Sequence, residues 1–100
     1  MLVTGAPSYA REMRAVHVVV TGFVQGVGFR CSTCHVAERF GVSGWVRNRP
    51  DGSVELHVEG GGTDVGAILS WLRQGPAGAR VDAVAVEDAA VEGSIGFAIR

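Results

Sequence analysis

The sequence predicts an α+β sandwich with the element order β-α-β-β-α-β, and three observations support this prediction. Two segments repeat apolar residues at helical spacing, whereas shorter segments between and around them carry the β-branched or alternating patterns of strands. Breaks that contain glycine or proline separate most of these segments. Their order along the chain indicates two strand–helix–strand halves within one domain.

The composition is that of one globular domain. Of the 100 residues, 47% are apolar and 19% are charged, which argues against a disordered chain. The formal net charge of −1 argues against a nucleic-acid binder, and no run reaches the roughly 18 apolar residues of a membrane span. Residues 1–14 lack the pattern of a secretory signal. We therefore expect a flexible tail over 1–14, one domain over 15–100, a cytoplasmic location and, by default, a monomer.

The first half consists of a strand and a helix. The alternation of valines predicts a strand over Ala15–Thr21, with Val16, Val18 and Val20 facing the core. A helix is expected from about Phe29 to Phe40, and Gly41 is a natural stop for it. The apolar stripe of this helix comprises Phe29, Thr33, Val36, Ala37 and Phe40.

A β-hairpin follows, with strands at Val42–Asn48 and Ser53–Glu59. The turn over residues 49–52 contains a proline and an Asp-Gly pair, which suit tight turns. Because the second strand alternates regularly, we expect one of its faces in the core and the other in water. The expected core residues are Val54, Leu56 and Val58, and those facing water are Ser53, Glu55, His57 and Glu59, with His17 on the same wet face.

The second half repeats the scheme. After three glycines, Thr63 or Asp64 is expected to cap a helix that ends at the Gly75-Pro76 break. Val81–Val86 predicts a strand with imperfect alternation, which suggests a bulge, and Phe97–Arg100 a short closing strand. The buried stripe of the helix comprises Val65, Ile68, Leu69 and Leu72.

Interleaving two such halves gives a ferredoxin-like sandwich, an antiparallel sheet with two helices on one face. In this topology the first and second strands run in the same direction, so both end at the same edge of the sheet. The loop that leads to Arg30 and the residue Asn48 are therefore expected to converge. The last strand is expected to run toward the same edge, which brings the chain end or Arg100 toward Arg30.

The stretch between the first strand and the helix has the character of an anion site. It carries glycines at positions 22, 26 and 28 and leads into a helix with Arg30 in its first turn. Such a junction directs several backbone N–H groups to one spot and adds the positive end of the helix dipole. The guanidinium of Arg30 can bind two oxygens of a phosphate.

Two stretches resemble the signatures of the acylphosphatase family. They are V-T-G-F-V-Q-G-V-G-F-R over Val20–Arg30 and G-W-V-R-N-R-P-D-G-S-V-E over Gly44–Glu55, in the family's order and spacing. The resemblance implies the same βαββαβ fold and hydrolysis of acyl phosphates to a carboxylate and inorganic phosphate, without a metal or other cofactor. It implies that Arg30 binds the phosphoryl group and that Asn48 positions the attacking water. The residues expected around the phosphate are Gly22, Val24, Gln25, Gly26, Val27, Gly28 and Phe29.

Three other interpretations remain open. An RNA-binding module of the same architecture would need aromatic residues on the strand Ser53–Glu59, which has none. A carbamoyl-phosphate-handling domain, like the one that opens a large hydrogenase-maturation protein, would need a long continuation beyond Arg100. A non-catalytic relative would be expected to lack Arg30 or Asn48, and both are present.

The helix also contains Cys31-Ser32-Thr33-Cys34-His35, which matches the C-x-x-C-H pattern of haem attachment. No export signal accompanies the pattern, and three local ligands are too few for a structural zinc site. The helical wheel places Cys31 and His35 opposite the apolar stripe and Cys34 on its flank. We therefore expect two thiols, of which Cys31, beside Arg30, is open to oxidation.

Overall fold

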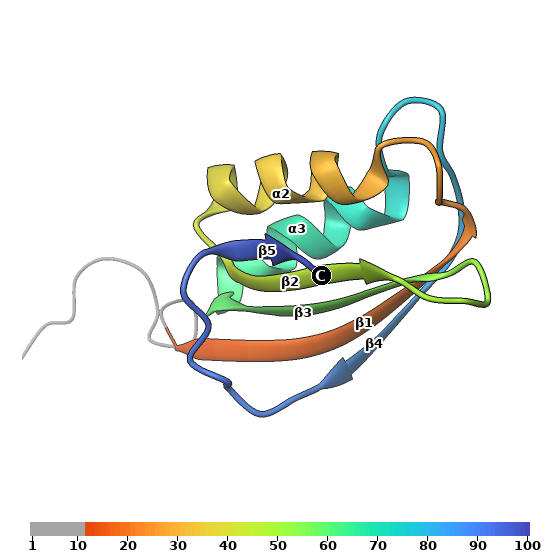
Figure 1. The fold of residues 1–100 in the computed structure, drawn as a ribbon. Coiled ribbons are helices and arrows are strands. Elements are labelled where there is room, and N and C mark those ends of the chain that lie inside the picture. Colours follow the sequence, from red (N-terminus) through yellow and green to blue (C-terminus); the bar gives the residue numbers. More distant parts are fainter. Residues whose placement is uncertain (1–11) are drawn as a thin grey trace, which may run out of the picture.

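The computed structural model describes residues 12–100 and confirms the predicted order of elements (Figure 1). Most of the predicted N-terminal tail lies outside the described residues, and the first strand begins within it, at Met13. The elements are β1 (Met13–Phe23), α2 (Phe29–Phe40), β2 (Ser43–Asn48), β3 (Val54–Gly61), α3 (Gly62–Gln74), β4 (Arg80–Asp88) and β5 (Phe97–Ile99).

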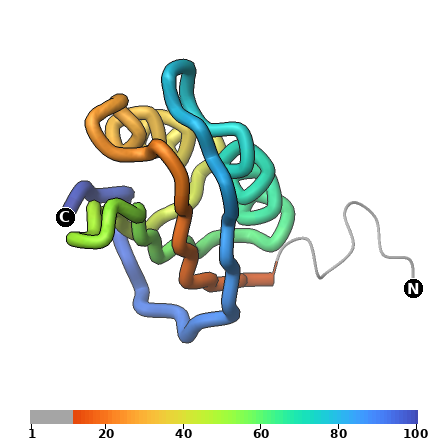
Figure 2. Tube along the Cα trace, turned by 90° about the vertical axis from the view of Figure 1, so that its right-hand side faces the viewer, coloured from red at the N-terminus to blue at the C-terminus, as the bar shows by residue number. Residues whose placement is uncertain are grey.

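The five strands form one sheet in the order β4-β1-β3-β2-β5, and both helices lie on the same face of it (Figures 1 and 2). Strand β3 pairs antiparallel with β1 and with β2, so β1 and β2 run in the same direction, as predicted. Strand β5 pairs parallel with β2, which makes the sheet mixed rather than wholly antiparallel. The last residues of β5 therefore point toward the end of the sheet where β1 and β2 end.

The core lies between the sheet and the two helices. On β1 and β3, Val16 pairs with Val58, Val18 with Leu56 and Val20 with Val54, and all six side chains are fully buried. Burial of each side chain of this size contributes roughly 1.5–3 kcal/mol. The helix residues that pack against this layer are the predicted ones, chiefly Phe29, Val36, Ala37, Val65, Ile68, Leu69 and Leu72.

The helix ends differ in how well the sequence predicted them. Helix α2 ends at Gly41, as predicted, in the left-handed conformation with φ of 68°. The prediction that Thr63 or Asp64 caps α3 is wrong. Helix α3 starts directly after Gly61, no side chain caps it, and the N–H of Gly62 donates to the carbonyl of Glu12. Strand β3 runs into the helix without a loop, so backbone from the start of β1 takes the place of a capping side chain.

The expected irregularity of the fourth strand is a bulge opposite Gly22. Thr21 pairs with Ala83 and Gly22 with Val81, which leaves Asp82 as an extra residue on β4. A Cβ atom on Gly22 would lie 2.1 Å from the carbonyl oxygen of Arg80. Only glycine fits this close approach of β1 to β4.

The prediction of one uniformly wet sheet face is wrong for His57 and Glu59, whose exposed fractions are 3% and 1%, and Ser53 is buried as well. The connection between β4 and β5, residues 89–96, crosses this face (Figures 1 and 2). The carboxylate of Glu59 accepts hydrogen bonds of 2.7 Å from the N–H groups of Glu92 and Ser94, and one of its oxygens lies 2.6 Å from Nε2 of His57. The sequence does not show this burial, because the covering segment lies more than thirty residues away in the chain.

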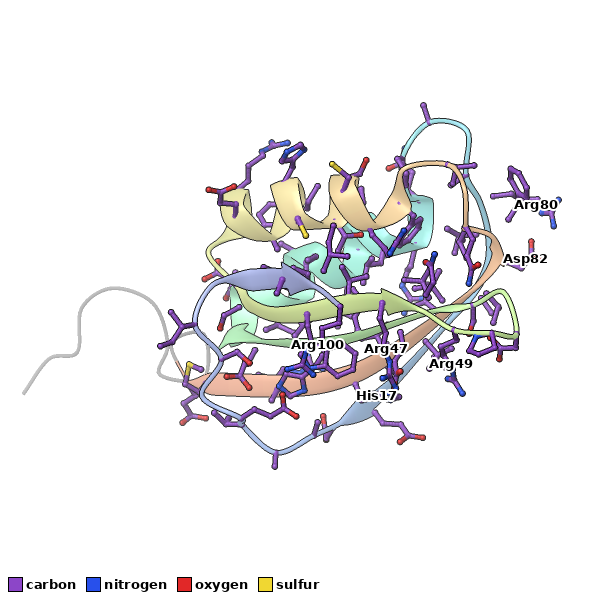
Figure 3. The ribbon with its side chains drawn as sticks, in the orientation of Figure 1. His17, Arg47, Arg49, Arg80, Asp82 and Arg100 are labelled. Carbon is purple, nitrogen blue, oxygen red and sulfur yellow. The ribbon has the colours of Figure 1, made fainter. Side chains whose placement is uncertain are left out.

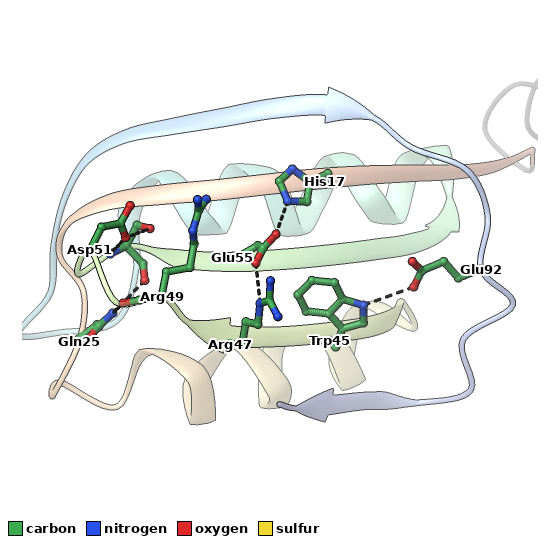
Figure 4. Close-up of polar contacts among 9 residues, drawn as sticks. His17, Gln25, Trp45, Arg47, Arg49, Asp51, Glu55 and Glu92 are labelled. Atoms are coloured by element: carbon green, nitrogen blue, oxygen red, sulfur yellow. Dashed lines mark hydrogen bonds and ion pairs between the residues drawn. The ribbon is translucent and has the colours of Figure 1, made fainter.

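The remainder of this face stays partly exposed. Glu55 accepts from Arg47 and pairs with His17, whose Nε2 lies 2.6 Å from the carboxylate (Figure 4). Trp45 stacks on His57 with ring centres 6.3 Å apart, and its Nε1 donates to Glu92. The covering segment, residues 89–96, is thus held by the buried carboxylate of Glu59 and by the indole N–H of Trp45.

We predict that Glu59→Gln lowers stability near neutral pH more than in acid. Burial raises the pKa of Glu59, but the hydrogen bonds from His57, Glu92 and Ser94 outweigh it and the pKa lies below its usual value. A carboxyl with a lowered folded-state pKa stabilises the fold above its unfolded value, about 4.3, and loses this contribution as pH falls through the folded value. Urea unfolding at pH 7 should show a loss of about 1.5–3 kcal/mol in the variant.

At about pH 3, below the unfolded value of about 4.3, the difference between variant and wild type should shrink, because the carboxyl of the unfolded wild-type chain binds a proton there. Glu87→Gln is the matched control, since Glu87 is exposed on β4 and makes no side-chain hydrogen bond to residues 12–100. An equal loss at both pH values would show that the charge of Glu59 is unimportant.

Candidate active site

The loop between β1 and α2 is shaped to present backbone N–H groups. Gly26 and Gly28 adopt left-handed conformations with φ of 77° and 76°, which glycine reaches without strain. Within residues 12–100, the N–H groups of residues 26–31 donate to no backbone carbonyl, and no side chain caps α2 at its N-terminus. These donors and the positive end of the helix dipole are available to an anion.

Arg30 lies in the first turn of α2 and lines the pocket next to this loop. The pocket has a volume of about 190 Å³, which is several times the volume that a water molecule occupies. Arg30 therefore shares one small cavity with residues of the glycine loop. The residues around the cavity are Val24, Gly26, Gly28, Phe29, Arg30, Cys31, Asn48 and Ile99.

Asn48, the last residue of β2, lines the same pocket, as the topology predicts. Asn48 and Val20 both pair with Val54 of β3, on opposite sides of that strand. The end of β2 therefore lies two strand spacings from the end of β1, where the glycine loop starts. The Oδ1 atom of Asn48 is buried and accepts no hydrogen bond within the described part of the chain. A buried amide oxygen without a partner costs free energy, so a donor from a ligand or water suits this position.

The side chain of Gln25 holds the turn after Asn48 and does not line the pocket. Its Nε2 donates to the carbonyl of Arg49 at 2.8 Å and to that of Ser53 at 2.9 Å (Figure 4). Asp51 accepts from the N–H and hydroxyl of Ser53, and these hydrogen bonds lower the pKa of Asp51. The glycine loop and the β2–β3 turn are therefore tied together directly, which holds Asn48, at the start of this turn, next to the loop.

The other predicted loop residues divide between the pocket and the core. Val24 and Phe29 line the pocket but are almost fully buried, and the ring of Phe29 packs against Trp71 with centres 5.9 Å apart. Val27 packs against the core and does not line the pocket. Gly22 lies away from the pocket, and the bulge on β4 accounts for its lack of a side chain.

Two further residues of the pocket were not predicted as site residues, Cys31 and Ile99. Strand β5 reaches the Arg30 end, as its expected direction implies, but it brings Ile99 there. The expectation for the Arg100 side chain is wrong, because its guanidinium lies 4.7 Å over the ring of Trp45 (Figure 3). Side chains alternate along a strand, so when Ile99 faces the helices, Arg100 faces the other side.

This arrangement suits the binding of a tetrahedral anion beside a small hydrogen-bond donor, such as water, that Asn48 holds. Arg30 and the loop amides supply positive charge, and Asn48 supplies a fixed acceptor. Among the residues that line the pocket there is no carboxylate and no histidine. The site is therefore suited to a reaction that needs charge neutralisation and positioning more than proton transfer by the protein.

A βαββαβ sandwich with such a cradle at the end of its sheet defines a class of small phosphoryl-binding proteins. Within that class, the acylphosphatase family model matches residues 16–99 of the chain. An acylphosphatase from Anaeromyxobacter dehalogenans is 52% identical over 92 residues, which cover 91% of this chain and 98% of that protein. The chain belongs to the acylphosphatase family, whose enzymes act on small-molecule acyl phosphates.

Solved structures agree with this assignment. The structure of an acylphosphatase from Coxiella burnetii is 39% identical and superimposes with a TM-score of 0.85, covering 88% of this chain and 93% of that one. The crystal structure of full-length HypF in its phosphate- and nucleotide-bound form is 25% identical with a TM-score of 0.80. The match covers 90% of this chain but only 12% of HypF, so it concerns one part of a much longer protein.

The side chains and helices of residues 12–100 do not meet the requirements of two other kinds of site. No group of three or more His, Cys, Asp and Glu side chains there could hold a metal ion. No helix there is long and apolar enough to cross a membrane.

We predict that Gln25→Ala impairs the site through Asn48 and not through phosphate binding. The variant loses two hydrogen bonds to turn carbonyls, which should cost about 1–2 kcal/mol of stability. The kcat for acyl phosphate hydrolysis should fall roughly tenfold, since small errors of position are costly, while inhibition by inorganic phosphate changes little. Gln74→Ala, at the exposed end of α3, is the control. A loss of phosphate inhibition in Gln25→Ala would instead place that side chain among the phosphate ligands.

Proposed function

We propose that this protein hydrolyses the carboxyl–phosphate bond of small acyl phosphates in the pocket shared by Arg30 and Asn48. The observation that carries the proposal is the buried Oδ1 of Asn48, which has no partner within residues 12–100 and lines the same cavity as the glycine loop. Arg30 and the loop amides bind the phosphoryl group, and Asn48 holds the attacking water.

Binding of the phosphoryl group is supported by three kinds of positive charge at one place. The loop N–H groups have no backbone acceptor among the described residues, the dipole of α2 ends here, and the guanidinium of Arg30 carries a full charge. A guanidinium binds two phosphate oxygens in a planar, bidentate fashion. These groups offset the charge that gathers on the equatorial oxygens as the bond to the leaving group breaks.

Attack by water requires orientation, which an amide provides. The Oδ1 of Asn48 accepts one hydrogen of the water and so directs an oxygen lone pair at phosphorus. An amide does not remove the second proton, and we assign that proton to a phosphate oxygen of the substrate. The carboxylate is already a good leaving group, so no general acid is needed. The P–O bond to the acyl group breaks as the new P–O bond forms, giving a carboxylate and inorganic phosphate.

The roles in this mechanism belong to side chains and amides of the chain and to the substrate's own phosphate, and we propose that the reaction needs no added metal or other cofactor. We also propose a monomer that acts in the cytoplasm without nucleic-acid or membrane partners. Both cysteines are free thiols, as expected in a reducing compartment. Sedimentation at assay concentration would test the monomer.

The assignment is tested by hydrolysis of a chromogenic aryl acyl phosphate in the presence of excess chelator. The wild type should be active. Arg30→Ala should lose activity by about 1000-fold or more, because it removes the charge that holds the transferred group. Asn48→Ala should lose kcat by about 100–1000-fold while phosphate still inhibits, because the water and not the phosphate loses its partner.

Arg39→Ala is the matched control, since this arginine lies in the last turn of the same helix, exposed and away from the pocket. The proposal would be abandoned if the wild type were inactive, or if the three variants behaved alike.

The pH profile tests the proton assignment. If the substrate's own phosphate accepts the proton from water, kcat should stay within about threefold between about pH 5 and 7. A tenfold change per pH unit in that interval would indicate a titrating side chain as the general base. Asn48→Asp, which places a carboxyl at the same position, is the informative comparison, because any slope that it adds to the wild-type profile reports a titrating group at this site.

A further inference from the structure

The two cysteines of α2 lie one helical turn apart and each opens onto a pocket. Cys31 is exposed and lines the candidate active site, directly after Arg30. Cys34 is half-buried and lines a second pocket of about 440 Å³, formed by the later part of α2 and the starts of β2 and β5. Neither thiol has a role in the proposed hydrolysis, and no third ligand joins them in a possible metal cluster among residues 12–100.

The positions of the two thiols suit an intramolecular disulfide formed after a small local shift. Residues three apart on a helix have Cβ atoms about 5–6 Å apart, whereas a disulfide needs about 3.5–4.5 Å. Both cysteines lie in the first half of α2, whose N-terminus has no side-chain cap. Buried Phe29 and Thr33 hold the inner side of this turn. The exposed side, where Cys31 lies, is the side that can shift, because the first N–H groups of a helix have no intrahelical acceptor.

The two thiols also differ in the way that a reacting pair requires. Burial raises the pKa of Cys34, and nearby Cys31 and Glu38 raise it further. Cys34 is thus kept as a protonated, sheltered thiol, whereas Cys31 is the one that an oxidant meets from solvent.

We propose that Cys31 and Cys34 form a reversible disulfide that disables the pocket of Arg30, with a hydroperoxide as the oxidant. The Cys31 thiolate attacks one oxygen of the peroxide, the O–O bond breaks, and the released alkoxide or hydroxide takes a proton. The sulfur of Cys34 then attacks the sulfenic sulfur as its thiol gives up a proton, the S–O bond breaks, and the departing hydroxide takes a proton and leaves as water. Two thiols and one hydroperoxide thus give a disulfide, water and an alcohol or a second water.

The disulfide would distort the pocket because of the place of Cys31 in the chain. Drawing its Cβ toward Cys34 distorts the turn that carries Phe29 and Arg30, both of which line the pocket. An error of about 1 Å in position can cost on the order of 100-fold in rate. A disulfide strained in this way is also readily reduced, which makes the change reversible. The effect on catalysis rests on the proposed function, but disulfide formation does not.

The experiment follows mass, phosphate binding and activity in parallel. Fully reduced protein is treated with hydrogen peroxide and then with dithiothreitol. The expected product is a monomer lighter by two hydrogen atoms, with hydrolysis and phosphate binding both reduced about 100-fold and restored by the reductant. Saturating phosphate should slow alkylation of Cys31 by iodoacetamide but not that of Cys34, because only Cys31 lines the phosphate pocket.

Two variants separate the steps, each compared with its own untreated sample. Cys34→Ser should keep the basal activity and stop at a sulfenic acid on Cys31, which dimedone traps. Cys31→Ser should show no loss of mass and no loss of phosphate binding after peroxide. The proposal would be overturned if both thiols stayed reduced after exposure to peroxide. It would also be overturned by a disulfide that leaves phosphate binding unchanged. If the reduced wild type hydrolyses no acyl phosphate, the proposed function fails. The mass and the phosphate binding of the oxidised protein still decide whether the disulfide forms and disables the pocket.

Discussion

The active site depends on the pairing of β3 with both β1 and β2. Val54 is the shared residue, because Val20 pairs with it on one side and Asn48 on the other. Antiparallel pairing on both sides makes β1 and β2 parallel and ends them at the same edge, about 10 Å apart across two strand spacings. The glycine loop and Asn48 thus line one pocket because of strand register. A slip of one residue in β2 would turn Asn48 to the opposite face.

The remaining contacts hold this edge of the sheet in place. Gln25 ties the glycine loop to the β2–β3 turn, and the bulge beside Gly22 brings the end of β1 close to β4. On the far face, Glu59 anchors the segment over residues 89–96, which crosses the sheet and delivers β5 to the free edge of β2. In this way a buried carboxylate on one face determines where Ile99 closes the pocket on the other.

The site relies on few chemical groups because its substrate class is already activated. In the proposed mechanism, charge from Arg30 and the loop amides and orientation by Asn48 are sufficient for a carboxylate leaving group. Such a site is also sensitive to changes in one helical turn. Phe29, Arg30 and Cys31 are consecutive, so the proposed disulfide at Cys31 would act on Arg30 directly through the backbone.

The sequence by itself determined the elements, their order and the two catalytic candidates. Alternating valines, helical stripes and glycine breaks are local signals, and strand direction follows from element order alone, which places Arg30 beside Asn48. Only the tertiary structure decided what lies on the far face of the sheet. Glu59 and His57 read as solvent-facing because alternation reports a strand's two faces and not what covers them. The covering segment, the clamp by Gln25 and the place of Ile99 all depend on residues distant in the chain, and no local pattern records them.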